Sequence, residues 1–208
     1  PGMDANKRPY VMFYEAYGNY MTRVNSFTST NGPPNKDIFV TGGDPSPPND
    51  LTSSYTLNAE PLGYAPYLVK AGTRAIYSCE VRYTGGKVNR YLQMDTPCPE
   101  RTDPYGVWRG LNKGSRYGQV VSIPVFWLYT ADGPDRKKLF RCWDPANFDT
   151  FASTTVSAQN PDVSTCNGVP GAISEHSLGW VSIGWRSNGQ LATDMVGALQ
   201  NRIHMAYS

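Results

Sequence analysis

The sequence predicts an all-β fold in a single domain that covers residues 1–208. Three observations predict it. Glycine or proline interrupts almost every window of helical length, short aromatic and β-branched runs alternate with turn-forming residues, and one cysteine-containing pattern occurs twice. The 208 residues include 20 glycines and 17 prolines, which favour many turns between short strands. Composition does not shift along the chain, which favours one domain over two.

Five segments have the apolar and aromatic character of strands. They are residues 10–17, 75–83, 120–129, 138–143 and 180–185. Within the third segment, Pro124 lacks the backbone N–H that a central strand needs, so we expect an edge strand or a bulged strand there.

Four stretches between these segments are rich in Gly, Pro, Asn and Asp, and we expect loops in residues 31–35, 41–50, 98–115 and 160–174. At the C-terminus, residues 190–207 carry apolar side chains at both helical and alternating spacings. We expect a short helix there, followed by a closing strand.

A repeated pattern joins a glycine-containing strand start, an apolar strand that ends in cysteine, a polar loop, an aromatic residue and a second cysteine. One copy covers residues 62–116 and the next covers residues 117–177. Self-similarity at this period indicates repeated structural units. Because each copy holds two of the four cysteines, pairing within the copies predicts the disulfides Cys79–Cys98 and Cys142–Cys166.

A third copy is divided between residues 178–208 and 9–61. Its C-terminal part begins Leu178-Gly179-Trp180, as the first copy begins Leu62-Gly63-Tyr64. Its N-terminal part contains Met12-Phe13-Tyr14-Glu15, which is similar to the cysteine-bearing strand of the second copy. This division brings the first and last strands together and removes exposed sheet edges. The expected organisation is therefore pseudo-three-fold and β-trefoil-like, and chance similarity among aromatic-rich strands is the alternative.

The second copy contains Leu139-Phe140-Arg141-Cys142, an aromatic and hydroxyl-bearing loop at residues 148–153, then Cys166 and Leu178-Gly179-Trp180. This order resembles a sugar-binding repeat of secreted bacterial proteins. That repeat carries Leu-Tyr-Arg-Cys, a Gly-Asp-His-Phe-like loop with Ser or Thr, a second Cys and Leu-Gly-Tyr. The resemblance covers about 120 of the 208 residues, and the His of the family loop is absent here. It implies an extracellular recognition module.

Net charge and cysteine usage indicate where the protein is located and which classes of partner it binds. The net charge is +2 with no basic block, which disfavours nucleic acid as a partner. No apolar run has the length needed to cross a bilayer, so we expect no membrane insertion. None of the cysteines lies in a CxxC motif, and four cysteines in two pairs favour disulfides and a secreted or cell-surface location.

Signatures of catalysis are missing from the sequence. There is no GxSxG, HExxH, P-loop or dinucleotide-binding motif, and His176 has no neighbour spaced as a second metal ligand. The segment from Asp144 to Asp149 lacks the EF-hand pattern. We therefore expect neither cofactor nor metal and no enzymatic activity. A glycan hydrolase with paired carboxylates is the enzymatic alternative, but no spacing singles out two of the five glutamates.

Sugar recognition requires aromatic faces beside polar side chains, because a sugar ring offers apolar C–H faces and many hydroxyls. Corresponding loops of the three copies supply such residues, and we expect them to form equivalent pockets. The expected ligand-binding residues are Trp143, Asp144, Asn147, Asp149, Arg82, Tyr83, Lys87, Asn89, Tyr20 and Asn25, together with Trp108 from a turn-rich loop.

The sequence thus predicts an extracellular, non-catalytic, lectin-like module whose partner is a glycan on a cell surface. One alternative is the receptor-binding tip of a larger assembly such as a pilus, a phage tail or a toxin. Another is a protease inhibitor on a trefoil scaffold.

Overall fold

The computed structural model describes residues 21–30, 37–42, 55–58, 60–116 and 119–183. These residues form fourteen strands and one short 3-10 turn, η1 (Cys166–Gly168), so the all-β expectation is confirmed. The strands are β1 (Met21–Ser29), β2 (Ile38–Gly42), β3 (Tyr55–Leu57), β4 (Gly63–Pro66), β5 (Thr73–Tyr83), β6 (Val88–Met94), β7 (Arg101–Asp103), β8 (Gly106–Gly110), β9 (Lys113–Arg116), β10 (Gln119–Ser122), β11 (Phe126–Tyr129), β12 (Arg136–Asp144), β13 (Asp149–Ser153) and β14 (Ile173–Ser182). Within these ranges, no helix has the length and apolar character to cross a membrane.

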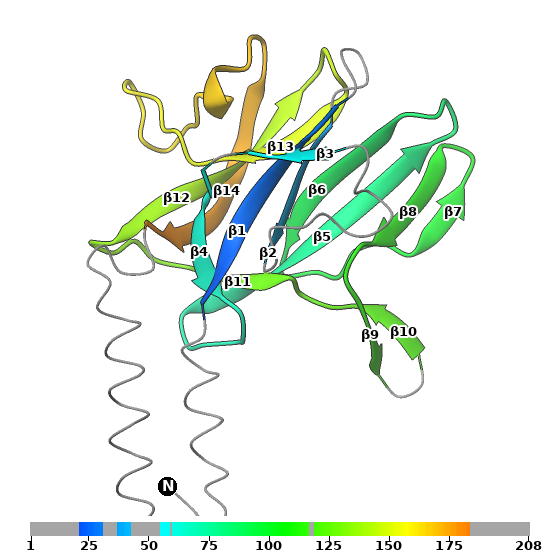
Figure 1. Ribbon diagram of the computed structural model, residues 1–208, viewed down its shortest axis with the longest axis horizontal. Coiled ribbons are helices and arrows are strands. Elements are labelled where there is room, and N and C mark those ends of the chain that lie inside the picture. Colours follow the sequence, from blue (N-terminus) through cyan, green and yellow to red (C-terminus); the bar gives the residue numbers. More distant parts are fainter. Residues whose placement is uncertain (1–20, 31–36, 43–54, 59, 117–118, 184–208) are drawn as a thin grey trace, which may run out of the picture.

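Twelve strands belong to one antiparallel sheet, whose main path runs β2-β1-β4-β14-β11-β5-β8-β7. Strand β12 pairs with β14 and β13, β3 pairs with β1, and β6 pairs with β5. The path is open, with β2 and β7 at its ends. Strands β9 and β10 form a separate hairpin that projects from the body of the molecule (Figure 1).

Three hairpins, β1–β2, β5–β6 and β12–β13, pair in matching registers. Val24, Ile76 and Leu139 hold corresponding positions in β1, β5 and β12. Val24 lies opposite Gly63 of β4, Ile76 lies opposite Phe126 of β11, and Leu139 lies opposite Gly179 of β14. Two residues further along β1, β5 and β12, the residues opposite on the second strand of each hairpin are Val40 in β2, Leu92 in β6 and Ala152 in β13. The three hairpins therefore direct the same strand positions into one interior.

The main core follows this correspondence. It consists of Phe126 and four sets of three matching residues: Val24, Ile76 and Leu139; Val40, Leu92 and Ala152; Leu62, Val125 and Leu178; and Ala65, Leu128 and Val181. All are buried and all are apolar. Burial of each larger aliphatic side chain stabilises the fold by about 2 kcal/mol.

A cycle of side-chain to backbone hydrogen bonds links the second strands of the three hairpins. Asp37 Oδ1 accepts from the N–H of Arg90 at 3.3 Å, and Asn89 Oδ1 accepts from the N–H of Thr150 at 2.9 Å. Asp149 Oδ2 accepts from the N–H of Ile38 at 2.9 Å and closes the cycle. Asp37, Asn89 and Asp149 are buried and hold corresponding register positions, so each hairpin supplies one acceptor to the next.

The expected strands at residues 75–83 and 138–143 are confirmed as β5 and β12, each slightly longer than expected. The expected strand at 120–129 is wrong as one element. It divides into β10 and β11, with Pro124 in the gap, because proline cannot donate to a ladder. The expected strand at 180–185 begins earlier, at Ile173, and β14 ends at Ser182.

The expected loop at 98–115 contains β7, β8 and most of β9 despite its turn-rich composition. Strand β8 pairs with β5, β7 pairs with β8, and β9 pairs with β10. In the expected loop at 41–50, Thr41 and Gly42 belong to β2. Residues 160–172 lack strands apart from one isolated bridge at Ser164, in keeping with a loop.

The register of β1 shows which N-terminal residues correspond to the first strands of the other two hairpins. Val24–Phe27 of β1 holds the position that we expected Met12–Glu15 to hold, and residues 10–17 lie outside the described ranges. Aromatic-rich strands resemble one another in sequence, so the pairing partner decides the alignment where composition cannot. The expected C-terminal helix at 190–207 also lies outside the described residues.

Candidate ligand-binding surface

Four aromatic side chains from two hairpins and β8 gather at one surface, which we name the aromatic cluster: Tyr83, Trp108, Trp143 and Phe148. The ring centroids of Tyr83 and Phe148 are 5.2 Å apart, and those of Trp143 and Phe148 are 5.0 Å apart. Tyr83 and Trp108 lie at 6.5 Å. The interplanar angles of 72°, 74° and 79° are all edge-to-face, the arrangement that the aromatic quadrupole favours.

Phe148 is the central ring, and its backbone is held in an unusual conformation. It sits in the turn between β12 and β13 with φ of 56°, a left-handed value that non-glycine residues rarely adopt. The buried carboxylate of Asp144 holds this turn, accepting from the N–H of Ala146 at 3.0 Å and from Asn147 Nδ2 at 2.6 Å. Phe148 remains 40% exposed, so the turn presents a large apolar ring to solvent.

Strand alternation places Tyr83 and Trp108 on the same face as this ring. Val81 lies opposite Trp108 in the β5–β8 ladder, and Tyr83 follows two residues later on the same face of β5. The β5–β6 turn closes through an N–H···O bond from Gly86 to Tyr83, with Gly86 at φ of 82°. This short turn brings Lys87 back toward the rings.

Cationic side chains border the aromatic cluster. Lys87 Nζ lies 5.5 Å from the ring centroid of Phe148, and Arg101 Cζ lies 4.5 Å from the ring centroid of Trp108. Arg101 is also paired with Asp103 at 3.4 Å. Among the described residues, Lys87 forms no ion pair.

A second cation contact adjoins this surface. Arg141 Cζ lies 5.0 Å from the ring of Tyr91, and Arg141 is paired with Glu175 at 2.7 Å. Burial raises the pKa of Tyr91, and the charges of Arg141 and Arg101 oppose that rise. Tyr91 therefore lies within electrostatic reach of both guanidinium groups.

Of the expected ligand-binding residues, the structure brings Tyr83, Lys87, Trp108 and Trp143 to this one surface. They come from both copies of the repeated sequence pattern, and the described structure brings them together at one surface. Sequence reasoning missed Phe148 and Arg101 as site residues. A large apolar residue between Asp144 and Asp149, inside a turn-forming segment, was the available signal for Phe148.

The remaining expected residues do not face this surface. Asn25, Asn89, Asp144 and Asp149 are buried. The side chain of Asn147, only half-buried, donates to Asp144 and supports the turn. Tyr20 lies outside the described residues.

Arg82 points to the opposite face of β5, into a largely buried ionic cluster. Glu80 is fully buried, and Oε1 is 2.6 Å from Arg82 Nε and 2.8 Å from Arg109 Nε. Its Oε2 is 2.7 Å from Arg90 Nη2, and Arg90 Nη1 is 2.6 Å from Asp37 Oδ2. Burial raises the pKa of Glu80, but the surrounding arginines lower it overall, so this carboxylate stays ionised.

Tyr55 completes this cluster by donating its hydroxyl to Asp37 and accepting from Arg90. Burial and the Asp37 carboxylate raise the pKa of Tyr55 above its usual value, so it stays protonated. The cluster joins β3, β5, β6, β8 and Asp37, which directly precedes β2. None of the described residues forms a group of three or more metal-ligating side chains.

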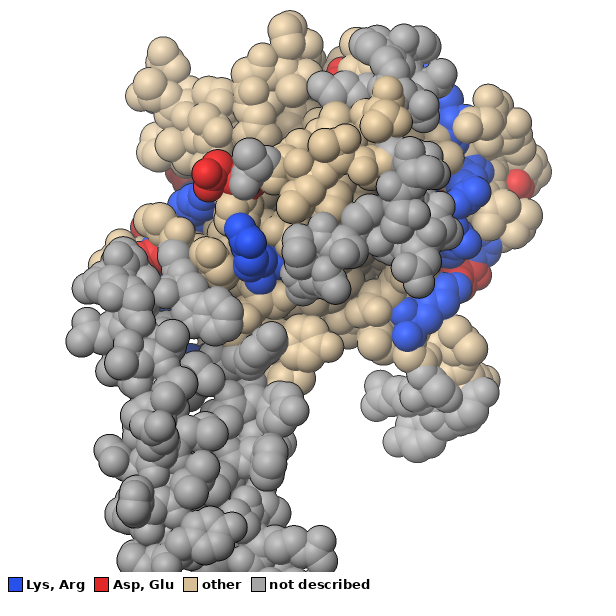
Figure 2. Space-filling view, in the orientation of Figure 1, with Lys and Arg blue, Asp and Glu red and all other residues tan. Residues whose placement is uncertain are grey.

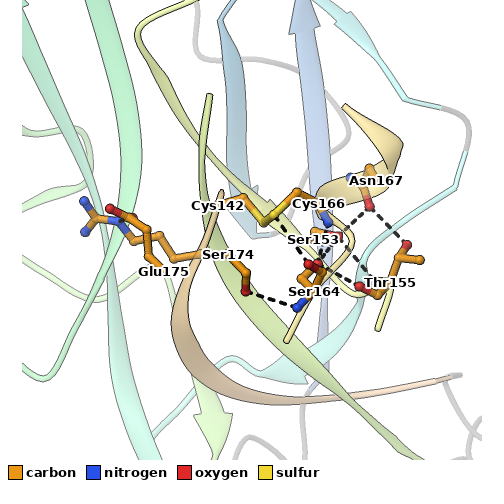
Figure 3. The surroundings of a disulfide bond; sticks show 9 residues. Cys142, Ser153, Thr155, Ser164, Cys166, Asn167, Ser174 and Glu175 are labelled. Atoms are coloured by element: carbon orange, nitrogen blue, oxygen red, sulfur yellow. Dashed lines mark hydrogen bonds and ion pairs between the residues drawn. A yellow bond between two sulfur atoms is a disulfide. The ribbon is translucent and has the colours of Figure 1, made fainter. Parts of the chain in front are cut away.

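Both expected disulfides, Cys79–Cys98 and Cys142–Cys166, are present, and their presence is compatible with an extracellular location. Hydroxyl and amide groups surround the second bridge (Figure 3). Ser153 Oγ donates to Asn167 Oδ1 at 2.6 Å, and Ser164 Oγ accepts from the N–H of Cys166 at 2.8 Å. These bonds hold the long segment between β13 and β14 against the core.

Comparison with known proteins identifies no relative. No family model, no curated protein and no solved structure matches this chain. The geometry of the aromatic cluster and its cationic border is therefore the basis for a functional proposal.

Proposed function

We propose that this protein is a secreted, non-catalytic carbohydrate-binding module that binds glycans at the aromatic cluster. The observation that carries the proposal is the exposed Phe148 ring, held by the Asp144 turn between Tyr83 and Trp143. An apolar ring that is fixed at the surface offers a preformed platform for a sugar face. Preformed platforms bind with a lower ordering cost than mobile side chains.

The chemistry around the platform is that of sugar recognition. Sugar C–H groups pack on aromatic faces, while hydroxyls exchange hydrogen bonds with nearby donors. Lys87 and Arg101 supply donors within the same surface. The two disulfides support a secreted module, because such bridges persist in oxidising compartments.

We further propose a pseudo-three-fold, β-trefoil-like organisation in which β1–β2, β5–β6 and β12–β13 are the hairpins of three related units. Matching registers, the four sets of core residues and the hydrogen-bond cycle through Asp37, Asn89 and Asp149 support this organisation. The aromatic cluster lies between two of these units, so the glycan site is a feature of their junction.

A glycan array with the purified protein tests the proposed function. We expect Phe148→Ala to lower affinity for any bound glycan at least tenfold, because loss of the central ring removes about 1.4 kcal/mol or more of contact. Tyr67→Ala is the matched control, since Tyr67 is an exposed aromatic residue on the distant β4–β5 loop. If the folded protein binds no glycan, or if both variants weaken binding equally, the proposal is wrong.

One observation favours the receptor-binding tip as a second candidate. The β9–β10 hairpin projects from the body, and its Val120 is 69% exposed (Figure 1). An exposed apolar hairpin is a suitable contact for a protein partner. Size-exclusion chromatography with light scattering distinguishes the candidates, because a stable ring or trimer that Val120→Asp dissociates would favour an assembly subunit over a monomeric lectin.

A further inference from the structure

We propose that the sugar bound at the aromatic cluster is acidic, with its carboxylate or sulfate group at Lys87. This inference rests on the proposed function and adds to it the chemical class of the ligand. It depends on the position of Lys87, on the balance of charge along the border of the aromatic cluster, and on the mutual angles of the rings.

The first step is the position of Lys87. Its ammonium group lies over the ring of Phe148, the most exposed ring of the cluster, at 5.5 Å from the ring centroid. A pyranose is about the size of an aromatic ring, so a sugar that packs on Phe148 brings a ring substituent within reach of this ammonium group.

The second step is the charge balance. Arg101 and Arg141 have acidic partners, Asp103 and Glu175, whereas Lys87 has none among the described residues. The aromatic cluster and its border therefore hold one positive charge without a protein counter-charge. Lys and Arg also form a band over the β5 and β8 side of the molecule (Figure 2). Arg82 of β5 and Arg109 of β8 point away from the aromatic cluster and are paired with Glu80, so they add nothing to this balance. An anionic ligand gains a charge-assisted hydrogen bond here, whereas a neutral sugar gains only an ordinary one.

The third step concerns the competing ligand, single-stranded nucleic acid, which also binds aromatic and basic surfaces. Strand binding stacks successive bases on separate aromatic platforms along a groove. Here the rings meet edge-to-face at 72° to 79° with centroids 5.0 to 6.5 Å apart, which makes one compact cluster rather than a series of platforms. A single sugar unit fits this arrangement better than a run of bases.

The main comparison of the test is between two saccharide probes of equal length, measured by calorimetric titration. One is a hexasaccharide in which every second unit is a uronic acid, and the other is a neutral N-acetylglucosamine hexasaccharide. A sulfated hexasaccharide separates sulfate from carboxylate, and a single-stranded hexanucleotide represents nucleic acid. We expect an acidic probe to bind about tenfold more tightly than the neutral probe at 50 mM salt, and the difference to shrink at 300 mM salt.

The variants assign the preference to one side chain. Lys87→Gln keeps the length and polarity of the side chain but removes its charge, and we expect it to lower affinity for the acidic probe to the level of affinity for the neutral probe. The control Lys70→Gln changes an exposed lysine on the β4–β5 loop and should alter neither.

Each other outcome overturns a distinct statement. Equal affinity for acidic and neutral sugars, or an acidic preference that survives Lys87→Gln, overturns this inference and leaves the proposed function intact. Binding of no saccharide overturns both. Tighter binding of the hexanucleotide than of every saccharide overturns the choice of glycan as ligand.

Discussion

Asp149 is a buried acid in an environment that disfavours its charge. Burial and the neighbouring Asp37 carboxylate raise the pKa of Asp149 to about 9. Its Oδ2 accepts the Ile38 N–H, while Oδ1 has no hydrogen-bond donor among the described residues. The folded environment therefore favours the protonated form of Asp149 at neutral pH.

This proton makes stability depend on pH. The unfolded chain releases it near pH 4, whereas the folded chain holds it up to about pH 9. Between these values the folded state binds more protons, so the free energy of unfolding falls as pH rises. We predict that Asp149→Asn abolishes this fall and stabilises the protein by about 2 kcal/mol at pH 8, as measured by urea unfolding from pH 5 to pH 9.

The structure offers a precedent for this substitution, because Asn89 holds the corresponding position in the β5–β6 hairpin and makes the same backbone contact. Asp162→Asn is the control, since the Asp162 side chain is exposed and its ion pair with Lys138 lies at the surface. An unchanged pH slope in Asp149→Asn would contradict the protonation of Asp149. The sequence identified Asp149 as a ligand residue because aspartate in a turn-rich loop usually faces solvent, and burial reversed that role.

At the scale of elements, one position at the start of β4 and one inside β14 depend on glycine. Gly63 and Gly179 have φ values of +148° and +136° and correspond in register, which explains the repeated Leu-Gly-aromatic pattern of the sequence. A Cβ on Gly179 would lie 2.8 Å from the carbonyl oxygen of Tyr129 and 2.9 Å from Leu128 Cβ. Only glycine therefore fits where β14 crosses from β12 to β11.

We predict that Gly179→Ala lowers the free energy of unfolding by about 2 kcal/mol or more, because the strained φ and the backbone clash add together. Gly85→Ala is the matched control, since a Cβ there meets nothing within 4 Å. That change should leave stability unaltered or slightly increased, as seen in thermal unfolding by circular dichroism. Equal stability of the two variants would contradict a special role for Gly179.

The elements that the sequence predicted well are those with a strong local pattern. Strands β5 and β12 each carry a short apolar segment shortly before a cysteine, and both disulfides follow from the repetition of this pattern. Strands β7 and β8 have weak local patterns and exist because they pair next to β5. The aromatic cluster was beyond local reasoning for the same reason, since Trp108 meets Tyr83 only through that pairing.

At the scale of the whole molecule, the first strand of each hairpin is fixed at the same register position, by a disulfide in two hairpins and by an aromatic pair in the third. Cys79 and Cys142 hold this position in β5 and β12 and form disulfides, whereas Phe27 holds it in β1 and packs on Phe39 with ring centroids 6.0 Å apart. An aromatic pair thus replaces a covalent bridge in the N-terminal hairpin. The divided copy of the sequence pattern lacks cysteines, and Phe27 stands at the register position that cysteine holds in β5 and β12.

This substitution of one kind of contact for another predicts comparable energetic costs. Phe27→Ala should lower the free energy of unfolding by about 3–5 kcal/mol, because it leaves a cavity at a fully buried site. The double change Cys142→Ser with Cys166→Ser should lower it by about 3 kcal/mol, since the bridge closes a loop across 24 residues. Denaturant unfolding of each variant gives the comparison, with the exposed Val120→Ala expected to change stability by less than about 0.5 kcal/mol.

The unfolding midpoints of Phe27→Ala, measured by two spectroscopic signals, also distinguish one cooperative unit from three hairpins that unfold independently. The hydrogen-bond cycle passes from Asp37 to Asn89 to Asp149, so each hairpin depends on its neighbour for one buried partner. Phe27→Ala should therefore lower the midpoint reported by far-ultraviolet circular dichroism and by tryptophan fluorescence equally, although Phe27 packs in a separate hydrophobic cluster with Phe39, Tyr55 and Leu111. Separate midpoints for the two signals would show that the N-terminal hairpin unfolds alone, and would contradict the coupling that the cycle implies.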